Sequence, residues 1–413
     1  MINIHEALDS VLAAVRPLPA EEVPLLQALG RAAAERIISP EQVPTFANSA
    51  MDGFAVSGAE LEAGRREFRI TFDIPAGRYV SETVGPGDAA RIMTGAPVPA
   101  GTDTVVQVEH TTSDGESMTV ETAPETGANV RRAGEDVTVG DVLFERGAHL
   151  GAAEVGLLAA VGIERIRVAR RPRVAVLATG SELVAAGQPL APGQIRNSNS
   201  YTAYGQVLAA GGDPILLGIA RDDPDETRRL LAAALENDVV ITSGGVSVGD
   251  YDFVKQVQDD LGVERHFWGI ATKPGKPMAF GTRGETLVFG VPGNPVAAMV
   301  SFEMYVRPAL LAMQGRPDVY RPWFHADSAE PVRRTKGRTE ARRCRLTHDG
   351  GAIRFTTTGP QGSGILSSMA GAEGLFFVPP EYPGGEIGTE LLVMLLGGTS
   401  SERPPFPGAV PAG

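Results

Sequence analysis

Hydrophobic and polar positions divide the 413-residue chain into regions with different periodicities. Residues 66–122 are rich in short strand-like segments separated by turns, which favours a small β domain. After the basic linker at residues 170–173, short apolar runs alternate with helical patterns, and this alternation predicts a parallel sheet covered by helices. From about residue 319 the helical pattern stops. The chain is therefore predicted to hold several domains, of which one is α/β and the others are mainly β.

The first half of the chain contains two predicted helices near its start. Asn3 is a capping residue with Glu6 at capping-box spacing, and apolar residues then recur on one helical face. A second, short helix is expected over residues 25–38, with a break at Gly30. Further on, the pattern predicts strands at residues 68–74, 89–93, 104–109, 118–122 and 163–168 and a helix at residues 152–161.

The α/β region has an expected order of strands and helices. Asp223 and Pro224 are typical of a helix start, and Asp349-Gly350-Gly351 is a hairpin signal in the region that follows. The Pro-rich tail from Arg403 is expected to be disordered. The predicted strands are residues 174–178, 215–219, 239–241, 286–290, 342–346, 352–357, 375–378 and 390–396, and the predicted helices are residues 200–210, 296–313 and the segments that follow Asp223 and Asp252.

Two adjacent glycines follow the apolar run at residues 239–241. Gly244 and Gly245 allow a sharp turn and the close approach of a ligand to the backbone. Asp252 can cap the next helix, so the glycines lie between the carboxyl end of a strand and the start of a helix, where open α/β sheets bind ligands. Carboxylates at Asp250 and Asp252 would repel a bare phosphate and suggest a bridging Mg²⁺. The alternative is an ordinary strand-to-helix turn capped by an aspartate.

Composition excludes several classes of protein. Cys344 is the only cysteine, so neither an intrachain disulfide nor a cysteine-rich metal site is expected. The net charge of −13 argues against non-specific binding of nucleic acid. No apolar run reaches membrane-spanning length and the first residues do not resemble a signal peptide, so we expect a cytoplasmic protein without membrane contact.

Several short motifs together resemble the molybdopterin molybdenumtransferases, the MoeA and gephyrin E-domain family. Each motif is weak alone, but their order over nearly the whole chain is specific. The motifs are Asn48-Ser-Ala-Met-Asp-Gly53, Thr94-Gly-Ala-Pro-Val-Pro99, Gly101-Thr-Asp-Thr-Val-Val106, Gly134-Glu-Asp136, Thr179-Gly-Ser-Glu-Leu183, Ser243-Gly-Gly-Val-Ser-Val-Gly249, Lys273-Pro-Gly-Lys-Pro277 and Pro292-Gly-Asn-Pro295.

The resemblance implies a multidomain α/β plus β fold. An elongated N-terminal domain (1–45 with 129–171) would carry an inserted small β domain (46–128). A doubly wound molybdopterin-binding α/β domain (172–318) and a C-terminal, barrel-like β domain (319–402) would follow, with a disordered tail (403–413). Family members are homodimers whose active site lies between the α/β domain of one subunit and the N-terminal region of the other.

The resemblance also implies the reaction. Molybdate would be inserted into adenylylated molybdopterin with release of AMP, with Mg²⁺ required and a molybdopterin adenylyltransferase as the pathway partner. The substrate supplies the dithiolene sulfurs, which is consistent with a single cysteine. Cleavage of the pyrophosphate link needs Mg²⁺ held by one or two carboxylates. Glu182, Asp222, Asp250 and Asp252 all follow predicted strands, so they can gather at one sheet edge.

The family's functional residues map onto positions along the chain. The implied catalytic residues are Asp252, Glu182, Asp52 and Asp136, and the implied metal ligands are Asp252, Asp222 and Glu182. The implied substrate-binding residues are Thr94, Arg131, Thr179, Gly180, Ser243, Gly244, Gly245, Ser247, Lys273, Lys276, Pro292, Pro295, Arg343 and Ser363. Lys273 and Lys276 would bind the molybdate dianion.

Simpler interpretations stay open for single residues. Asp222 or Asp223 can be only a helix cap, and Asp52 a turn residue. Arg131 can lie in a solvated charged loop, and Arg343 in a solvated run of arginines. Pro292 and Pro295 can simply shape a loop. The chain also departs from the family pattern at Ala297, Phe54 and Ser181, where relatives more often carry a serine, a tyrosine and an acid.

Two other functions compete with molybdenum insertion. A molybdopterin adenylyltransferase shares the α/β domain, but it would not need residues 1–170 or the C-terminal β domain. A non-catalytic scaffolding relative would have no reason to keep acids and lysines at successive strand-to-helix turns.

Overall fold

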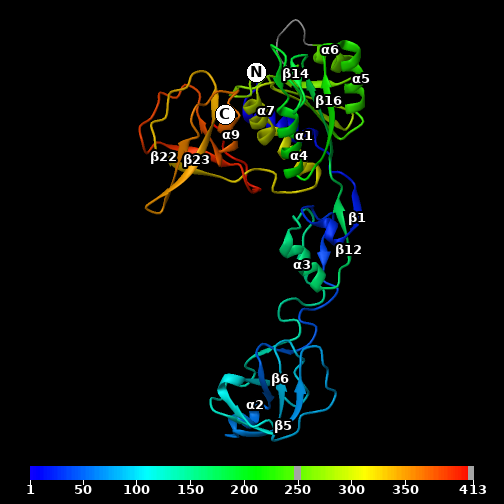
Figure 1. Ribbon diagram of the computed structural model, residues 1–413, viewed down its shortest axis with the longest axis vertical. Coiled ribbons are helices and arrows are strands. Elements are labelled where there is room, and N and C mark those ends of the chain that lie inside the picture. The colour runs from blue at the N-terminus through cyan, green and yellow to red at the C-terminus, as the bar shows by residue number, and fades with distance from the viewer. Residues whose placement is uncertain (246–252, 408–413) are drawn as a thin grey trace, which may run out of the picture.

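The computed structural model describes residues 1–245 and 253–407. The chain forms an elongated molecule in which a narrow arm joins a compact upper body to a separate β domain at the far end (Figure 1). The first residues and the last described ones, up to residue 407, lie in the upper body, so the chain runs down the arm and returns along it. The multidomain α/β plus β fold expected from the sequence is confirmed.

The arm consists of three small antiparallel ladders. In each ladder one strand precedes the inserted domain and the other follows it. The paired strands are β1 (Ala20–Pro24) with β12 (Arg165–Ala169), β2 (Ile37–Ile38) with β11 (Val142–Phe144), and β3 (Asn48–Ser49) with β10 (Val130–Arg131). Helix α3 (Ala152–Ala160) packs its Leu158 into a small core with Val23, Ala28 and Ile166.

The prediction of a helix over residues 25–38 is wrong. Only the single 3-10 turn η1 (Leu25–Ala28) forms there. Gly30 then adopts φ = +76°, a left-handed conformation that ends the turn, and the chain continues extended into β2. Pairing with the returning chain replaces the helical hydrogen bonds, as Ala33 N–H donates to Ala148 and Gly30 N–H to Leu150.

The inserted domain is one six-stranded sheet with apolar clusters on both faces. Its strand order is β7-β4-β6-β5-β9-β8. Phe54 and Val56 of β4 point into one cluster while Ala55 points into the other, as expected from the alternation of side chains along a strand. The elements are β4 (Gly53–Val56), α2 (Gly58–Glu62), β5 (Glu67–Ile74), β6 (Asp88–Ile92), β7 (Thr104–Gln107), η2 (Val108–His110), β8 (Thr111–Ser113) and β9 (Ser117–Val120).

The α/β domain is built on a six-stranded sheet with the order β16-β13-β17-β21-β20-β18. The first four strands are parallel, and β20 and β18 extend the sheet as antiparallel strands. The sheet strands are β13 (Arg173–Thr179), β16 (Asp213–Ala220), β17 (Val239–Ser243), β18 (Glu264–Trp268), β20 (Ala279–Arg283) and β21 (Thr286–Val291), and a small pair is formed by β14 (Leu183–Val184) and β15 (Ile195–Arg196).

Helices cover both faces of this sheet. Val174 and Val176 of β13 face one apolar cluster, whereas Ala175 and Leu177 face clusters on the other side. The first face is covered by α1, α4, α7 and α8, and the second by α5 and α6, which makes the domain doubly wound. The helices are α1 (Ile4–Ala14), α4 (Asn199–Ala209), α5 (Pro224–Ala234), α6 (Phe253–Asp260), α7 (Pro295–Ser301), the π-helical turn η3 (Phe302–Val306) and α8 (Arg307–Met313).

Helix α1 belongs to the α/β core by its packing. The predicted capping box is confirmed, because the Asn3 side chain accepts from Glu6 N–H and the Glu6 carboxylate accepts from Asn3 N–H, each at 2.9 Å. Ile4 and Leu8 are buried in the main cluster of the α/β domain. Residues 1–14 were assigned to the elongated domain from the sequence, but their apolar face packs into the core of the α/β domain.

The C-terminal domain is a closed five-stranded barrel. Its strands follow the circular order β23-β24-β22-β26-β25, and β25 pairs back onto β23. Cys344, Phe355 and Phe376 fill its interior. The elements are β22 (Trp323–Ser328), β23 (Thr339–Asp349), β24 (Ala352–Thr357), α9 (Ser367–Ala370), β25 (Gly374–Val378) and β26 (Glu390–Leu395), and β19 (Thr272–Lys273) from the α/β domain adds to the edge of β23.

Residues 403–407 are not disordered, which corrects the expectation for this part of the tail. Phe406 is 4% exposed and lies 4.9 Å from Phe377 between ring centroids. Its carbonyl accepts from His5 Nε2, and Arg403 pairs with Asp9 at 2.7 Å. The apolar side chain and the ion pair hold the segment against α1. Residues 408–413 lie outside the described residues.

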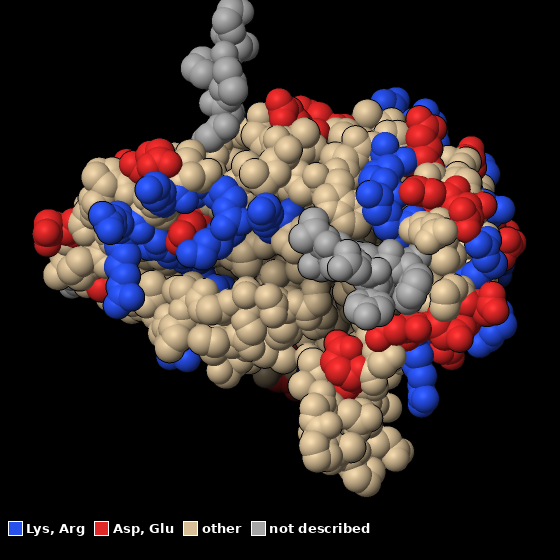
Figure 2. Space-filling view, turned by 90° about the horizontal axis from the view of Figure 1, so that it is seen from above, with Lys and Arg blue, Asp and Glu red and all other residues tan. Residues whose placement is uncertain are grey.

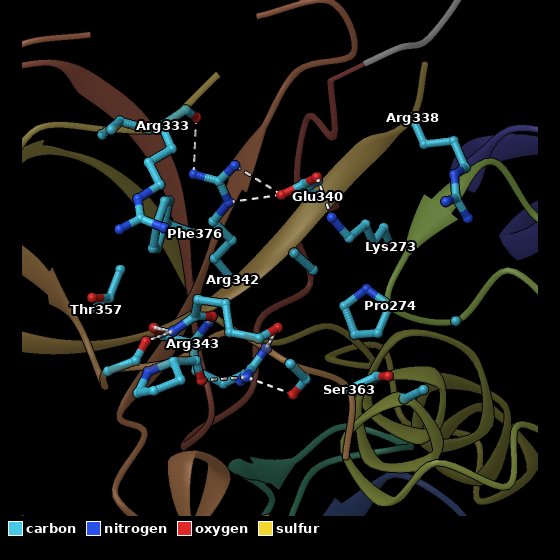
Figure 3. Close-up of a pocket in the computed structure, with 18 of the residues that line it drawn as sticks. Lys273, Pro274, Arg333, Arg338, Glu340, Arg342, Arg343, Thr357, Ser363 and Phe376 are labelled. Carbon is cyan, nitrogen blue, oxygen red and sulfur yellow. Dashed lines mark hydrogen bonds and ion pairs between the residues drawn. The ribbon is translucent and has the colours of Figure 1, made fainter. Parts of the chain in front are cut away.

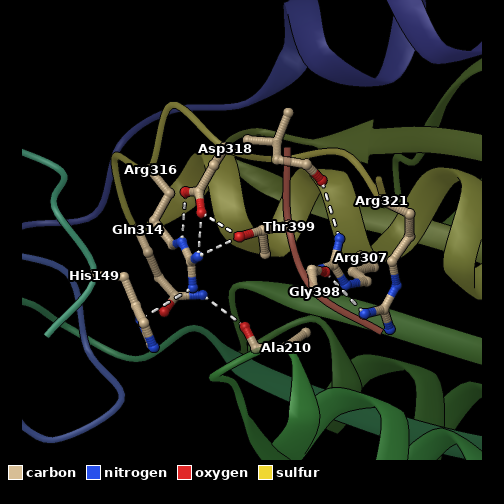
Figure 4. Close-up of polar contacts among 10 residues, drawn as sticks. His149, Ala210, Arg307, Gln314, Arg316, Asp318, Arg321, Gly398 and Thr399 are labelled. Carbon is tan, nitrogen blue, oxygen red and sulfur yellow. Dashed lines mark hydrogen bonds and ion pairs between the residues drawn. The ribbon is translucent and has the colours of Figure 1, made fainter. Parts of the chain in front are cut away.

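The arm, the α/β domain and the barrel meet at a polar joint (Figure 4). Arg316, after α8, contacts Asp318, Thr399 and the Nδ1 atom of His149. The nearby Arg307 is 4% exposed and donates to the carbonyls of Val319 and Gly398. Burial lowers the pKa of Arg307 to about 10, so it stays charged at neutral pH. The joint fixes three bodies against one another.

One helical stretch, Pro295–Met313, is long and apolar enough to cross a membrane by length and composition alone. It is 89% buried inside the structure. Its apolar surface is therefore explained by packing in the α/β core.

Asp238 is expected to make a pH-dependent contribution to stability. Arg170 donates to both of its oxygens at 2.8 Å, and Arg173 N–H donates at 2.7 Å. Burial acts to raise the pKa of Asp238, but these hydrogen bonds outweigh it and hold the pKa below the ordinary value of 3.8. The contribution is therefore present above pH 3.8 and lost as the pH falls through the lower folded pKa.

We expect Asp238→Asn to lower the free energy of unfolding by about 2 kcal/mol at pH 7, measured by urea denaturation. The difference from the native protein should shrink in acid, because the native carboxylate is then protonated too. Asp213→Asn is the matched control on the same sheet and should change stability by less than about 0.5 kcal/mol. An Asp238→Asn deficit that stays constant down to pH 2.5 would contradict the assignment.

Candidate active site

The carboxyl ends of four parallel strands form one edge of the α/β sheet. Thr179 of β13 lies in register with Ala220 of β16, and Ser243 of β17 lies in register with Val291 of β21. Backbone hydrogen bonds continue this contact into the loops, because Gly180 N–H donates to Ala220 and Gly244 N–H to Val291. Segments far apart in sequence are thus held side by side at this edge.

The glycines at this edge are required by the geometry. Gly244 has φ = +88°, and a Cβ added there would lie 2.8 Å from the Thr179 carbonyl oxygen. Gly245 has φ = +64°, and its added Cβ would lie 2.4 Å from Val254 of α6. Thr179 also donates through its hydroxyl to the Ser243 carbonyl at 3.3 Å. The double-glycine turn thus passes directly over the neighbouring strand.

Glu182 and Asp222 lie in adjacent loops at the same edge. Gly180 has φ = +140°, and a Cβ added there would meet the Glu182 carboxylate at 2.4 Å. Asp222 accepts from Ser181 N–H at 3.2 Å, and the Ser181 hydroxyl in turn accepts from Asp222 N–H at 3.0 Å. Ser181, one of the departures from the family pattern, thus links the two loops that carry the carboxylates.

The structure separates the roles of Asp222 and Asp223. Asp223 is the N-cap of α5 and accepts from Glu226 N–H at 2.8 Å. Asp222 accepts from the Ser181 backbone in the adjacent loop, so its carboxylate is directed toward the sheet edge. The helix-cap interpretation therefore applies to Asp223 and not to Asp222.

Part of the predicted metal site cannot be placed. Asp250, Asp252 and Ser247 lie outside the described residues. Within residues 1–245 and 253–407, no group of three or more His, Cys, Asp or Glu side chains forms a cluster able to hold a metal ion. Glu182 and Asp222 are the predicted metal ligands that the structure places at the sheet edge.

A cleft of about 1270 Å³ opens between the α/β domain and the barrel (Figure 3). The α/β domain contributes residues 273–277 together with Pro292 and Ala297, and the barrel contributes β23 and the loop at residues 359–363. Lys273, Lys276, Pro292, Arg343 and Ser363 all line it, so the structure brings these predicted residues together. Pro295 is the first residue of α7, a position where proline favours the start of a helix.

The cleft is strongly cationic. Among its described lining residues are two lysines and five arginines but only two acids, Glu330 and Glu340. In Figure 2, Lys and Arg side chains gather on the side of the molecule where the barrel lies in Figure 1. This concentration of positive charge in a protein with a net charge of −13 favours an anionic ligand in the cleft.

Arg343 supports the wall of the cleft. It is fully buried, and its guanidinium donates to the carbonyls of Pro360, Gln361 and Gly362 and to the Ser368 hydroxyl. Burial lowers its pKa from the ordinary value. The interpretation of Arg343 as part of a solvated run is wrong.

The loop that Arg343 supports carries Ser363 to the α/β domain. The Ser363 carbonyl accepts from Val296 N–H in the first turn of α7 at 3.1 Å. Ser363 is thereby held beside Ala297, the position where relatives more often carry a serine. The loop thus places a hydroxyl-bearing residue, Ser363, beside the start of α7.

The predicted residues of the N-terminal half form a separate group. Asp52 accepts from the backbone and hydroxyl of Thr94 at 2.7 and 2.8 Å, and these hydrogen bonds lower its pKa. Arg131 lies in β10 and pairs with Asn48, and Asp136 N–H donates to the Val43 carbonyl. This group lies around the β3–β10 ladder, where the arm joins the inserted domain, whereas the residues of the cleft belong to the α/β domain and the barrel in the upper body (Figure 1). Within one chain the two groups do not meet.

Sequence reasoning missed other charged residues of the cleft. Arg333, Arg334, Arg338, Glu340 and Arg342 line it, but none was singled out from the sequence. The strand was predicted to begin at residue 342, whereas β23 begins at Thr339. The signal that was available is the sequence Glu340-Ala-Arg-Arg343, whose charged residues fall on both faces once the strand is extended to residue 340.

The fold and the cleft together define the class of protein: a multidomain α/β chain with a cationic cleft between its α/β domain and a C-terminal barrel. Family models agree with this description along the chain. The MoeA N-terminal region (domain I and II) matches residues 2–162, a probable molybdopterin binding domain matches residues 175–312, and the MoeA C-terminal region (domain IV) matches residues 325–396.

Named relatives cover nearly the whole chain. The molybdopterin molybdenumtransferase 2 of Mycobacterium tuberculosis is 38% identical over 401 residues, which is 94% of this chain and 97% of the relative. The molybdopterin molybdenumtransferase of Haemophilus influenzae is 38% identical over 379 residues, 89% of this chain and 92% of the relative. A solved MoeA molybdopterin biosynthesis protein from Pyrococcus horikoshii superposes with a TM-score of 0.78 at 32% identity and covers 96% of this chain and 100% of its own. The chain belongs to the molybdopterin molybdenumtransferase family.

Proposed function

We propose that this chain is a molybdenum transferase that inserts molybdenum into molybdopterin during synthesis of the molybdenum cofactor. The observation that carries the proposal is the cationic cleft, which joins the lysine loop of the α/β domain to the barrel. Molybdate is a tetrahedral dianion, and the ammonium groups of Lys273 and Lys276 suit it as donors. Full-length relatives that share all of these domains carry the same activity in their names.

The organic substrate in this proposal is adenylylated molybdopterin, and AMP is released. The turn at Gly244 and Gly245 offers backbone N–H groups at the sheet edge, a geometry that suits phosphate oxygens. Thr179 and Ser243 shape this turn from the adjacent strands. The pterin end would lie along the edge and the oxyanion in the adjoining cleft.

Mg²⁺ is the proposed cofactor, and the donor set at the edge fits it. Carboxylate oxygens are the ligands that Mg²⁺ takes from proteins, usually one or two at a time. Glu182 and Asp222 would hold it together with Asp252. When bound, the ion neutralises the charge of a pyrophosphate link. Ser181 hydrogen-bonds to Asp222 and so holds together the two loops that carry Glu182 and Asp222.

A homodimer would complete the site. Asp52, Thr94, Arg131 and Asp136 lie at the far end of the arm from the cleft of their own chain. An elongated arm allows a second copy to bring this group to the sheet edge of the first. We further propose a cytoplasmic enzyme that takes its substrate from a molybdopterin adenylyltransferase.

The two competing functions fit less well. An adenylyltransferase needs only the α/β domain, whereas most of the cleft's positive charge comes from the barrel. A scaffold needs neither this cleft nor a carboxylate pair at a strand edge. Both alternatives leave the interdomain cleft without a role.

The decisive experiment is incubation of the full chain with adenylylated molybdopterin, Mg²⁺ and molybdate. We expect AMP release that depends on both molybdate and Mg²⁺, measured by chromatography of the nucleotides. Parallel reactions omit molybdate, replace it with sulfate, or contain a chelator. AMP release at the same rate without molybdate would refute the proposal, and adenylylation of molybdopterin from ATP would favour the adenylyltransferase.

A further inference from the structure

Glu340 occupies the centre of the cationic cleft (Figure 3). One carboxylate oxygen accepts from Lys273 Nζ at 3.0 Å. The other accepts from Arg342 Nε at 2.9 Å and lies 2.8 Å from Arg342 Nη2. The glutamate therefore holds two of the cations that line the cleft.

The carboxylate is fixed in this position by the fold. Its side chain is 13% exposed, whereas the Lys273 side chain is 59% exposed. Burial acts to raise the pKa of Glu340, but Lys273 and Arg342 outweigh it and lower the pKa, so the group is ionised at neutral pH. A permanent negative charge therefore lies inside a cleft suited to anions.

The backbone keeps the lysine and the glutamate together. Strand β19 of the α/β domain runs parallel to β23 of the barrel, and Lys273 lies in register with Glu340. Arg338 Nη1 also donates to the Thr272 carbonyl at 3.3 Å. The ion pair thus belongs to the interface between the two domains, and the backbone pairing of β19 with β23 holds its two side chains close together.

Lys276 provides a contrast within the same loop. It lines the same cleft, but its side chain makes no ion pair or hydrogen bond within the part of the chain that the structure describes. The charge of Lys273 is offset by Glu340, whereas Lys276 has no such counter-charge among the described residues. The two lysines are therefore not equivalent.

We propose that Glu340 sets the affinity of the cleft for its oxyanion, because its carboxylate competes with the anion for Lys273. This inference rests on the proposed function, since it concerns the same oxyanion. An entering dianion must share or displace the internal carboxylate, so the cleft binds it more weakly than its positive charge alone would allow. Glu340 acts through Lys273 and is a positioning and affinity-determining residue rather than a catalytic one.

The first test is Glu340→Gln, which keeps the shape of the side chain and removes its charge. We expect molybdate to bind about tenfold more tightly to the full chain by titration calorimetry, because one repulsive charge is lost close to the site. The KM for molybdate should fall while kcat changes less. Glu330→Gln removes the other acid of the cleft, and its expected gain is smaller because Glu330 accepts from Thr357 N–H at 2.8 Å rather than from a lysine.

The second test compares the unpaired lysine with the lysine–glutamate pair. We expect Lys276→Met to weaken molybdate binding by at least tenfold, because one positive charge is lost. The double variant Lys273→Met/Glu340→Gln removes both members of the ion pair and should weaken binding by only about threefold. Equal losses in Lys276→Met and the double variant would overturn the inference. So would weaker molybdate binding in a folded Glu340→Gln variant, which would mean that the carboxylate only supports the loop.

Failure of this inference differs from failure of the proposed function. If the native chain neither binds molybdate nor releases AMP in response to it, the proposed function is wrong. If the native chain does both and Glu340→Gln binds molybdate no more tightly, only the role of Glu340 is wrong.

Discussion

Arg343→Met is expected to lower the free energy of unfolding by about 3–5 kcal/mol and to abolish molybdate-dependent AMP release. The guanidinium is fully buried and donates to three consecutive carbonyls at residues 360–362 and to the Ser368 hydroxyl. Methionine has similar length but no donor, so these acceptors would be buried without partners. The loop that carries Ser363 to the start of α7 should then lose its fixed position.

Urea denaturation measures the stability and nucleotide chromatography the activity. Arg345→Met is the matched control, because Arg345 lies on the same strand but is exposed, and among the described residues it donates to the Gly371 carbonyl alone. We expect it to change stability by less than about 0.5 kcal/mol and to leave the activity intact. A fully stable Arg343→Met protein that has lost only molybdate affinity would show that the guanidinium binds the ligand instead of the loop.

Glu182→Gln is expected to reduce the rate of AMP release about 100-fold and to raise the Mg²⁺ concentration needed for half-maximal rate. The carboxylate lies beside Gly180 at the carboxyl edge of the sheet, in the loop that Asp222 contacts through Ser181. An amide keeps the size of the side chain but is a poor ligand for Mg²⁺. Asp222→Asn should act in the same direction by about tenfold, since it removes the charge of the second carboxylate.

The adjacent aspartate supplies the control for this pair. Asp223 caps α5, and asparagine caps helices about as well as aspartate, so Asp223→Asn should keep both the stability and the rate. The rates are measured over a series of Mg²⁺ concentrations. If Asp223→Asn loses activity as strongly as Asp222→Asn, the separation of the two roles is wrong.

Much of the fold follows from local patterns that the sequence shows directly. The strands 174–178, 239–241 and 286–290 are almost entirely apolar because a parallel sheet is covered on both faces, and the structure confirms them as β13, β17 and β21. The capping box at Asn3 and the proline at the start of α5 also specify their helices locally. In these cases one segment carries the information for its own conformation.

Other elements depend on partners that are distant in the sequence. Residues 25–38 contain a helix-compatible pattern, but hydrogen bonds to residues 148–168 hold most of the segment extended. Strands β18 and β20 were not predicted, because their short segments carry little periodicity and are stabilised by pairing of β20 with β21 and of β18 with β20. Residues 403–407 appeared disordered from their prolines, whereas burial of Phe406 against Phe377 orders them. Tertiary contacts decide each of these segments.

The candidate site likewise contains residues that local patterns predicted and residues that only tertiary contacts bring into it. The positions of Glu182, Asp222, Asp250 and Asp252 after predicted strands predicted that they share a sheet edge. The structure places Glu182 and Asp222 there, and Asp250 and Asp252 lie outside the described residues. Nothing local indicated that Arg343 is buried, because Arg343 and Arg345 fall on the same face of β23. Arg343 is covered by the distant loop at residues 360–362, whereas Arg345 is exposed. The competition at Glu340 depends on the pairing of β19 with β23, which joins residues 67 positions apart.

The three ladders of the arm also have a consequence for how the protein can be re-engineered. Every ladder contains one descending and one ascending chain segment, and the last pairs Ser49 with Val130. The inserted domain is therefore, in topological terms, the tip of a long hairpin. A short turn from Ser49 to Val130 would remove residues 50–129, eighty positions, at a single junction. The strand pairs of the three ladders in the arm would all be kept.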